Sequence, residues 1–349
     1  MKIVSAATAF PQHRYAQREI AAALAGFWGD RVEKPEFIPW LHARTGVEHR
    51  HLVLPLAAYE RLTTWGQINS LWIEAAHHLG RAALCKALTA PGLTPRELGA
   101  LFFVTVTGVA SPSIDAKLAN SLHMSPNVKR VPIFGLGCVA GAAGLARAAD
   151  YVRAFPDQVA ALVSVELCSL TWQRDDVSMA NLISTGLFGD GAAAVLVAGS
   201  ATPFDGPQIL ATRSIFYPGT EDVMGWNVSE RGFRIVLSPD VPQVIREHLR
   251  ADVDAFLAEH GLSRERIAGW IIHTGGPKVL DAVQDALALP DGALERSWDC
   301  LRRVGNLSSA SVLMVLEEVL AAGGGEPGTY SVLAAMGPGF CSELLLLRW

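Results

Sequence analysis

The segment Val131–Ala146, VPIFGLGCVAGAAGLA, contains no charged side chain and carries three local signals in succession. It starts with apolar and β-branched residues, continues through a Gly-Leu-Gly turn and ends in a run of Ala and Gly. These signals predict a strand, a tight turn and a small-residue helix that packs closely against its neighbours. A strand that leads directly into a buried helix is typical of a layered α/β fold.

Cys138 lies at the end of that turn, and we expect the helix to begin near Val139. At a helix N-terminus, free backbone N–H groups and the helix dipole favour a thiolate over a thiol. Cys138 is therefore a candidate nucleophile. A small apolar residue in a buried turn explains the same position, so the choice depends on partner residues elsewhere in the chain.

Two candidate partners follow in the second half of the chain. His273 ends the apolar stretch GWIIH and precedes a Gly-Gly-Pro turn, which predicts a histidine at a strand end. Asn306, within VGNLSSA, precedes a strongly apolar helix. Taken singly, such a histidine is more often structural and such an asparagine is more often a helix N-cap. Together with Cys138, they are the residue types that activate a thiol and hold an enolate or oxyanion.

Apolar strand-like runs alternate with helical segments along the chain, which predicts an α/β fold. Glycine turns at 189–191 and 337–339 precede two strongly apolar runs and indicate a unit that occurs twice. The segment 201–206, ATPFDG, interrupts the pattern. We therefore divide the chain into an N-terminal half, 1–203, which carries the cysteine, and a C-terminal half, 204–349, which carries the histidine and asparagine.

Composition narrows the class of protein. Half of the 349 residues are hydrophobic and 18% are charged, which is enough for a large core. A net charge of −5 gives no electrostatic footprint for nucleic acid. The uncharged runs are too short and too rich in Gly and Ala for insertion into a membrane. Five cysteines without metal-ligand spacing indicate a reducing cytoplasm and no structural metal.

Five ordered motifs carry a resemblance to a known family. They are GLGCVAGAAGL, LFGDGAAAVLV, IIHTGGPKVLDAV, GNLSSASVL and the terminal GPGFCSELLLLRW. In this order and spacing they resemble type III polyketide synthases, the chalcone-synthase-like branch of the thiolase superfamily. The resemblance runs from about residue 100 to the C-terminus, and Lys2–Ala7 would serve as the family's first strand. It implies a thiolase-like fold, in which duplicated βαβαβαββ halves form a layered αβαβα body.

The resemblance also implies roles for the residues named above. Cys138 resembles the nucleophile that accepts the acyl group, and His273 and Asn306 resemble the pair that drives malonyl decarboxylation. Phe188, within LFGDG, resembles the aromatic gatekeeper between the CoA tunnel and the reaction cavity. A protonated His273 beside Cys138 would hold the thiolate near neutral pH. The implied substrates are acyl-CoA and malonyl-CoA, with no cofactor.

The residues that select the substrate are less distinctive. The segment around Ser111 resembles bacterial alkylpyrone and alkylresorcinol synthases, and Ser111 aligns with the residue that reaches into the partner subunit's cavity. Ile235 stands where plant enzymes have a second aromatic gatekeeper, so we expect room for a medium or long fatty acyl starter. Thr171 and Ser308 align with cavity residues. Arg44 resembles one CoA-phosphate contact, although an ordinary solvated charge explains it equally well.

Three functions remain open at this point. The first is iterative condensation of malonyl-CoA onto an acyl-CoA starter by a homodimer, ending in an alkylpyrone or alkylresorcinol. The second is an initiating β-ketoacyl-carrier-protein synthase, which shares the Cys, His and Asn, although an acidic chain does not favour an acidic carrier. The third is a non-catalytic acyl-binding scaffold on the same fold. Such a scaffold needs none of the three polar residues.

Overall fold

The computed structural model describes residues 1–32, 34 and 36–349. The first half follows the predicted βαβαβαββ order. Its elements are β1 (Lys2–Ala9), α3 (Trp65–Thr89), β4 (Leu98–Thr105), α4 (Ile114–Ser121), β5 (Lys129–Phe134), α5 (Ala140–Ala154), β6 (Val159–Leu167) and β7 (Asp190–Ala198).

The second half repeats this order with one difference, because helix α9 stands where the first half has strand β5. Its elements are β8 (Gln208–Phe216), α7 (Val241–Ala258), β11 (Ile267–Ile272), α8 (Pro277–Leu287), α9 (Glu295–Val304), α10 (Ser311–Ala321), β12 (Tyr330–Gly337) and β13 (Cys341–Arg348). The connection 199–207 joins the halves, and the division at residue 203 lies within it. As a domain boundary, that division stays a prediction.

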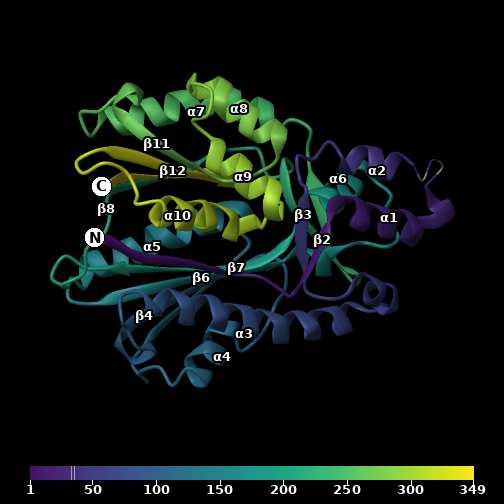
Figure 1. The fold of residues 1–349 in the computed structure, drawn as a ribbon, viewed down its shortest axis with the longest axis horizontal. Coiled ribbons are helices and arrows are strands. Elements are labelled where there is room, and N and C mark those ends of the chain that lie inside the picture. Colours follow the sequence, from purple (N-terminus) through teal and green to yellow (C-terminus); the bar gives the residue numbers. More distant parts are fainter. Residues whose placement is uncertain (33, 35) are drawn as a thin grey trace.

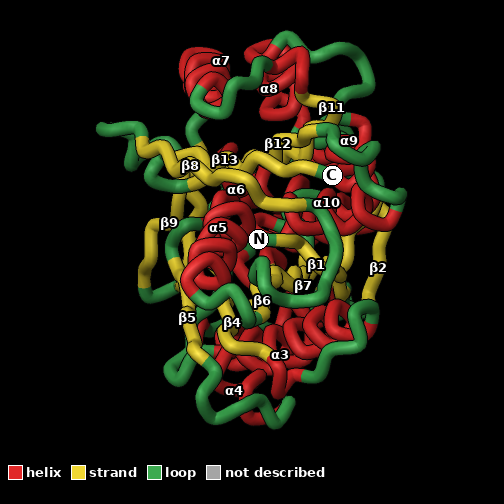
Figure 2. The backbone as a smooth tube through the Cα atoms, turned by 90° about the vertical axis from the view of Figure 1, so that its left-hand side faces the viewer, coloured by secondary structure: helices red, strands yellow, loops and turns green. Residues whose placement is uncertain are grey.

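The strand order makes the duplication visible. One half is ordered β1-β7-β6-β4-β5 and the other β8-β13-β12-β11, with the same parallel and antiparallel neighbours in equivalent places. The two sheets join through a single pair, Lys2 with Gln208. Helices α7 and α8 cover one sheet, α3 and α4 cover the other, and α5 and α10 lie between them (Figures 1 and 2). This is the αβαβα layering of the thiolase fold.

The middle helical layer explains the small residues of the opening segment. A Cβ on Gly141 would lie 2.1 Å from the Ser309 carbonyl oxygen, so only glycine allows α5 to approach the turn before α10 this closely. The remaining α5 positions that face the sheets are mostly alanine and fully buried. In the part of the chain that the structure describes, no helix combines the length and apolarity needed to span a bilayer.

Several elements lie outside the two repeated units. They are β2 (His13–Ala16), α1 (Gln17–Trp28), α2 (Phe37–His42), β3 (His49–Leu52), α6 (Met179–Leu187), β9 (Met224–Ser229) and β10 (Gly232–Leu237). Strands β9 and β10 form a two-stranded sheet of their own, separate from the central sheet. In Figure 2, β9 runs at the edge of the layers, and the Phe233 ring of β10 lies 6.2 Å from the Phe134 ring at the end of β5. This hairpin and α6 border the candidate site.

Candidate active site

Cys138 lies in a one-turn helix, Gly137–Val139, between β5 and the start of α5 at Ala140. The turn depends on Gly137, whose φ is +53° and whose Cβ would meet the ring of Pro338 at 2.7 Å. The sulfur is therefore held one turn before the long helix, nearly where the sequence predicted the helix start. Cys138 is buried, with 6% of its surface exposed.

Asn306 is oriented by the turn that starts α10. Its Oδ1 accepts hydrogen bonds from the Ser308 N–H at 2.7 Å and from the Ser311 hydroxyl at 3.4 Å. The Nδ2 group donates to the Gly275 carbonyl at 3.4 Å. Asn306 is not the N-cap that the ordinary interpretation expects, because Leu307 and Ala310 occupy the N-cap positions of the 308–310 turn and of α10. Its bonds to Ser308 and Ser311 nevertheless fix the orientation of its amide. Ser308 has a φ of 48°, a strained value that is common at functional sites.

His273 extends strand β11 by one residue, since its N–H donates to the Ala334 carbonyl at 3.0 Å. The side chain is 4% exposed, and neither ring nitrogen has a hydrogen-bond partner among the residues that the structure describes. A buried imidazole with two free nitrogens is costly unless a ligand satisfies them. His273 therefore has a free ring N–H that can donate a hydrogen bond to a substrate carbonyl.

The structure brings Cys138, from the first half, close to Ser308 and Asn306, from the second half. Cys138 Sγ donates a hydrogen bond to Ser308 Oγ at 3.7 Å, and the Asn306 side chain is near enough to lower the pKa of the thiol. His273 is joined to Asn306 through Gly275, the residue that accepts the Asn306 amide. The first half thus supplies the thiol, and the second half supplies the imidazole and amide.

The surroundings of Cys138 do not favour the predicted resting thiolate. Burial raises the pKa of Cys138 to about 12, and the contacts of the thiol with Ser308 and Asn306 only partly offset this effect. Burial also lowers the pKa of His273 to about 4. Both groups are therefore neutral near pH 7, because neither a thiolate nor an imidazolium is favoured without water. The sequence indicated a helix terminus, which lowers the pKa of a thiol, but it did not indicate the desolvation, which raises the pKa by more.

A small cavity lies beside Phe188, with a volume of about 10 Å³, which is room for about one water. It brings together the predicted cavity residues Thr171, Phe188 and Ile235, along with residues that were not predicted. These are Cys168, Trp172, Asn181, Ser184 and Trp226. Trp226 is the direct cross-strand partner of Ile235 in the β9–β10 hairpin, so the hairpin register was the signal that would have identified it.

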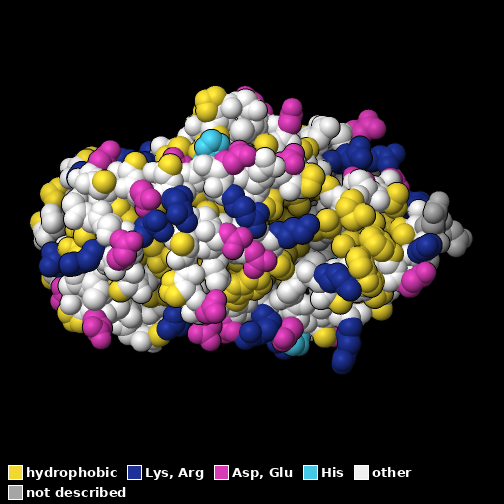
Figure 3. All heavy atoms as spheres, turned by 90° about the horizontal axis from the view of Figure 1, so that it is seen from above, with side chains coloured by type: hydrophobic (Ala, Val, Ile, Leu, Met, Phe, Trp, Pro, Cys, Tyr) yellow, Lys and Arg dark blue, Asp and Glu magenta, His cyan; other side chains and the backbone are white. Residues whose placement is uncertain are grey.

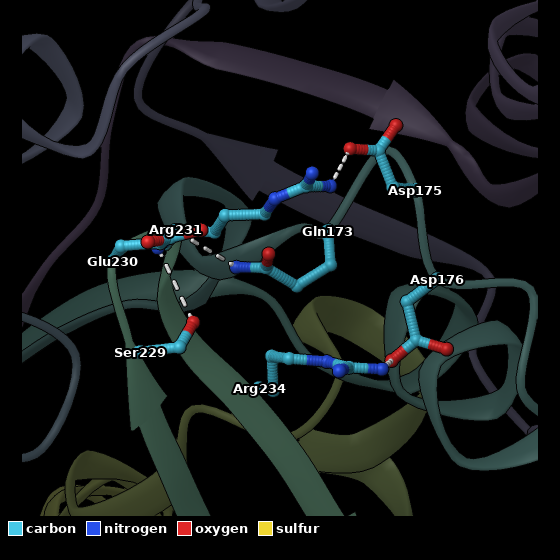
Figure 4. Close-up of a pocket in the computed structure, with 7 residues that line it drawn as sticks. All are labelled: Gln173, Asp175, Asp176, Ser229, Glu230, Arg231 and Arg234. Atoms are coloured by element: carbon cyan, nitrogen blue, oxygen red, sulfur yellow. Dashed lines mark hydrogen bonds and ion pairs between the residues drawn. The ribbon is translucent and has the colours of Figure 1, made fainter.

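The hairpin is fastened to the body by charged groups at its far end (Figure 4). Arg231 pairs with Asp175, and Arg234 Nη2 lies 3.2 Å from Asp176 Oδ2. Gln173 donates its amide to the Phe233 carbonyl at 3.0 Å. Together these contacts line a surface pocket of about 330 Å³ and hold the strand that carries Ile235.

Glu166 forms a buried polar network beneath the Cys138 turn. It accepts hydrogen bonds from Thr107 Oγ1 at 2.9 Å and the Val106 N–H at 3.1 Å, and from the Ser309 hydroxyl. Burial nevertheless raises the pKa of Glu166 to about 7. The carboxyl therefore titrates near physiological pH, one residue away from Ser308 in the turn.

Three of the predicted cavity and CoA-binding residues do not line this cavity. Ser308 contacts Cys138 instead, and Ser111 and Arg44 lie elsewhere. Ser111 is exposed in the loop between β4 and α4, where it does not touch the cavity of its own chain. The Arg44 guanidinium stacks on the Trp40 ring at 3.9 Å and donates to the Trp40 carbonyl. Trp40 is 50% exposed on α2, and apolar side chains gather at the end of the molecule where α1, α2 and α6 lie (Figure 3).

Comparison with known proteins agrees with this geometry. Models of the N- and C-terminal domains of chalcone and stilbene synthases match residues 52–202 and 208–349. The 1,3,6,8-tetrahydroxynaphthalene synthase of Streptomyces peucetius subsp. caesius is 51% identical over 345 residues, covering 98% of this chain and 91% of the relative. The phloroglucinol synthase of Pseudomonas fluorescens is 30% identical over 344 residues, covering 97% of each chain.

A solved structure extends the similarity to the whole fold. The crystal structure of the 1,3,6,8-tetrahydroxynaphthalene synthase of Streptomyces coelicolor A3(2), a bacterial type III polyketide synthase, superposes with a TM-score of 0.94. The match has 30% sequence identity and covers 100% of this chain and 99% of that one. The chain belongs to the type III polyketide synthases, transferases that extend acyl groups by decarboxylative condensation of malonyl-CoA.

Proposed function

We propose that this enzyme uses malonyl-CoA both to start and to extend the chain, and forms a polyhydroxylated aromatic product of the tetrahydroxynaphthalene type. The observation that carries the proposal is the cavity beside Phe188. It is closed by Trp172 and Trp226 and has a volume of about 10 Å³. A small starter needs the least displacement of these walls. The 51% identity with a tetrahydroxynaphthalene synthase supports the same choice.

The proposed loading step starts from the neutral pair. As the thioester binds, His273 takes the Cys138 proton, and the sulfur attacks the thioester carbonyl carbon. The bond from that carbon to the CoA sulfur breaks, and the CoA thiolate takes the proton from His273 and leaves as free CoA. Cys138 and His273 are both buried, so we propose that proton transfer between them replaces a permanent ion pair.

The proposed extension step uses the same neutral imidazole. When malonyl-CoA loses carbon dioxide, the electron pair of the broken C–C bond forms an enolate on the remaining acetyl thioester. The His273 N–H and Asn306 Nδ2 donate hydrogen bonds to that enolate oxygen, and each such donor is worth about 3–4 kcal/mol. The enolate carbon attacks the carbonyl carbon of the acyl group on Cys138, and the bond from that carbon to the sulfur breaks. The sulfur leaves as a thiolate and takes a proton from solvent as the site opens to the next substrate.

A long fatty acyl starter, with a pyrone or resorcinol product, remains the second candidate. Ser111 and Ile235 favour it, because both are smaller than the side chains expected at these positions in plant enzymes. Ser111 is exposed in the single chain. It would contribute to a cavity only across a homodimer interface, which we also propose. In a dimer, a small residue there would leave space for an alkyl chain.

The test is product analysis with malonyl-CoA alone and with a panel of acetyl, hexanoyl, palmitoyl and aromatic acyl-CoA starters. We expect an aromatic product from malonyl-CoA alone, identified by mass spectrometry, with little change when starters are added. A requirement for palmitoyl-CoA would establish the second candidate instead. A requirement for malonyl attached to a carrier protein would place the enzyme with the initiating synthases.

A further inference from the structure

Arg50, on strand β3, is a fully buried charged side chain whose hydrogen bonds all go to neutral acceptors. Its exposed fraction is 0%. Nε donates to Gln17 Oε1 at 3.0 Å, and Nη1 donates to the carbonyls of Thr185 at 2.6 Å and Phe188 at 2.7 Å. Buried arginines normally pair with a carboxylate, because desolvating the charge is expensive. The Asp190 carboxyl acts on Arg50 only through space, and Nη2 has no hydrogen-bond partner among the described residues. The specific bonds of this side chain therefore all go to the backbone carbonyls and to Gln17.

The carbonyls that Arg50 holds belong to the C-terminal end of α6 and the residue that follows it. A cation is favourable there, since the last carbonyls of a helix have no intrahelical partner and carry the negative end of its dipole. Burial lowers the pKa of Arg50 to about 10, so the guanidinium keeps its charge at neutral pH. The charge of Arg50 therefore fixes the end of α6 and the backbone of Phe188.

The same segment is bonded to Asn306 on its other side. The Asn306 N–H donates to the Leu187 carbonyl, and the Gly189 N–H donates to the Asn306 carbonyl, both at 2.9 Å. Arg50 also packs directly beneath this joint, because a Cβ on Gly305 would lie 3.1 Å from Arg50 Cδ. A movement of the Leu187–Gly189 backbone would therefore move the asparagine.

Gln17 completes the support from the start of α1. While its Oε1 accepts from Arg50, its Nε2 donates to the Gly186 carbonyl at 2.5 Å and to Thr45 Oγ1 at 3.0 Å. Gln17 thus connects the Arg50 side chain to the last turn of α6 and to the segment that follows α2. The side chains of Gln17 and Arg50 are thus bonded to each other, and both donate to backbone carbonyls at the end of α6.

We propose that Arg50 is a positioning residue for the condensing reaction: it braces the Leu187–Gly189 segment and thereby holds the Asn306 amide in the orientation that malonyl decarboxylation needs. The inference rests on the role proposed above for Asn306. It assigns to Arg50 no contact with the substrate. Misplacing a catalytic group by about 1 Å is enough to slow a reaction by about a hundredfold.

The test measures carbon dioxide release from carboxyl-labelled malonyl-CoA by the intact enzyme. Arg50→Lys keeps the charge, but one ammonium group cannot reproduce the planar fork of the guanidinium. We expect kcat to fall at least about tenfold with KM within about twofold, since geometry and not binding is lost. Arg14→Lys, on the exposed face of neighbouring β2, is the matched control and should retain full activity.

A double-mutant cycle separates positioning from general weakening of the fold. If Arg50 acts through Asn306, Arg50→Lys should cause no further loss of kcat in an Asn306→Ala background. Equal losses in both backgrounds, or full kcat in Arg50→Lys, would overturn the inference. Full carbon dioxide release by Asn306→Ala alone would instead overturn the role proposed for that asparagine.

A second variant decides the matter if Arg50→Lys does not fold. Gln17→Glu keeps an acceptor for Arg50 Nε but loses the donor to the Gly186 carbonyl. We expect the same fall in kcat, the same unchanged KM and the same absence of effect in the Asn306→Ala background. Wild-type kcat in folded Gln17→Glu protein would contradict the proposed brace.

Discussion

The catalytic centre and the β9–β10 hairpin border the same space but are held in opposite ways. The centre is buried and anchored by backbone hydrogen bonds, such as those that join Asn306 to Leu187 and Gly189. The hairpin is a separate two-stranded sheet, tied at its end by half-exposed arginines. Exposed ion pairs are worth about 1 kcal/mol or less, so the hairpin is the wall that yields most easily. The residues proposed for catalysis thus lie in the rigid region, and the wall that limits the size of the substrate lies in the region that can move.

The largest effect is expected in the rigid region, from Cys138→Ala. Product formation should fall at least about a thousandfold, because the acyl group loses its attachment point. The melting temperature should change little, since alanine fills the same small site. Product is measured by mass spectrometry, with Cys85→Ala as the control. A Cys138→Ala enzyme that still elongates starters would show that Cys138 is not the nucleophile.

The second effect concerns the buried carboxyl of Glu166 and its dependence on pH. Its pKa is raised to about 7 in the folded chain, above the unfolded value, so its favourable contribution is complete below pH 4.5. This contribution is lost as pH rises through 7 and amounts to about 3 kcal/mol in all. Glu166→Gln should remove that slope from urea-unfolding free energies measured between pH 5 and pH 8.

The histidines serve as an internal check on this measurement. The lowered pKa values of His42 and His273 make stability fall as pH drops below about 6.5 in wild type and variant alike. The difference between the two proteins therefore isolates the carboxyl. Identical pH profiles would mean that Glu166 is ionised in the fold at all these pH values.

The third effect lies in the adjustable wall. Trp226→Ala should raise kcat/KM for hexanoyl-CoA about tenfold, since each buried methylene adds about 0.8 kcal/mol once space is available. Starter kinetics measure it, and carbon dioxide release from malonyl-CoA should stay near the wild-type rate. Val228→Ala, on the same strand with a side chain 58% exposed, is the control. If both variants behave alike, Trp226 does not limit the cavity.

The smallest effect is expected at the hairpin's ion pairs. Arg234→Gln should speed amide hydrogen exchange in residues 224–237 about threefold, because it removes a half-exposed arginine from its pair with the buried Asp176, at a cost of about 0.5–1 kcal/mol. High salt should produce the same change in the wild type and little more in the variant. Arg246→Gln, which breaks an ion pair with Asp285 on the far side of α7, should leave this exchange unchanged.

The regions also differ in how far the sequence predicts them. The strand, turn and helix predicted within Val131–Ala146 are present as β5, the turn at Gly137–Val139 and α5, because local signals mark all three. Cys138, Asn306 and Ser308 meet as their motifs indicate. The hairpin was not predicted, since its contacts with Asp175 and Asp176 join segments more than fifty residues apart. The neutral state of Cys138 was missed because desolvation depends on the whole surrounding fold.

The most direct test of the central claim is a competition between starters with labelled malonyl-CoA. The enzyme receives uniformly ¹³C-labelled malonyl-CoA together with an excess of unlabelled hexanoyl-CoA, and the products are analysed by mass spectrometry. We predict an aromatic product in which every carbon is labelled, because malonyl-CoA supplies the starter and all extensions. A product that carries an unlabelled alkyl chain on a labelled ring would contradict the account and establish the fatty acyl starter.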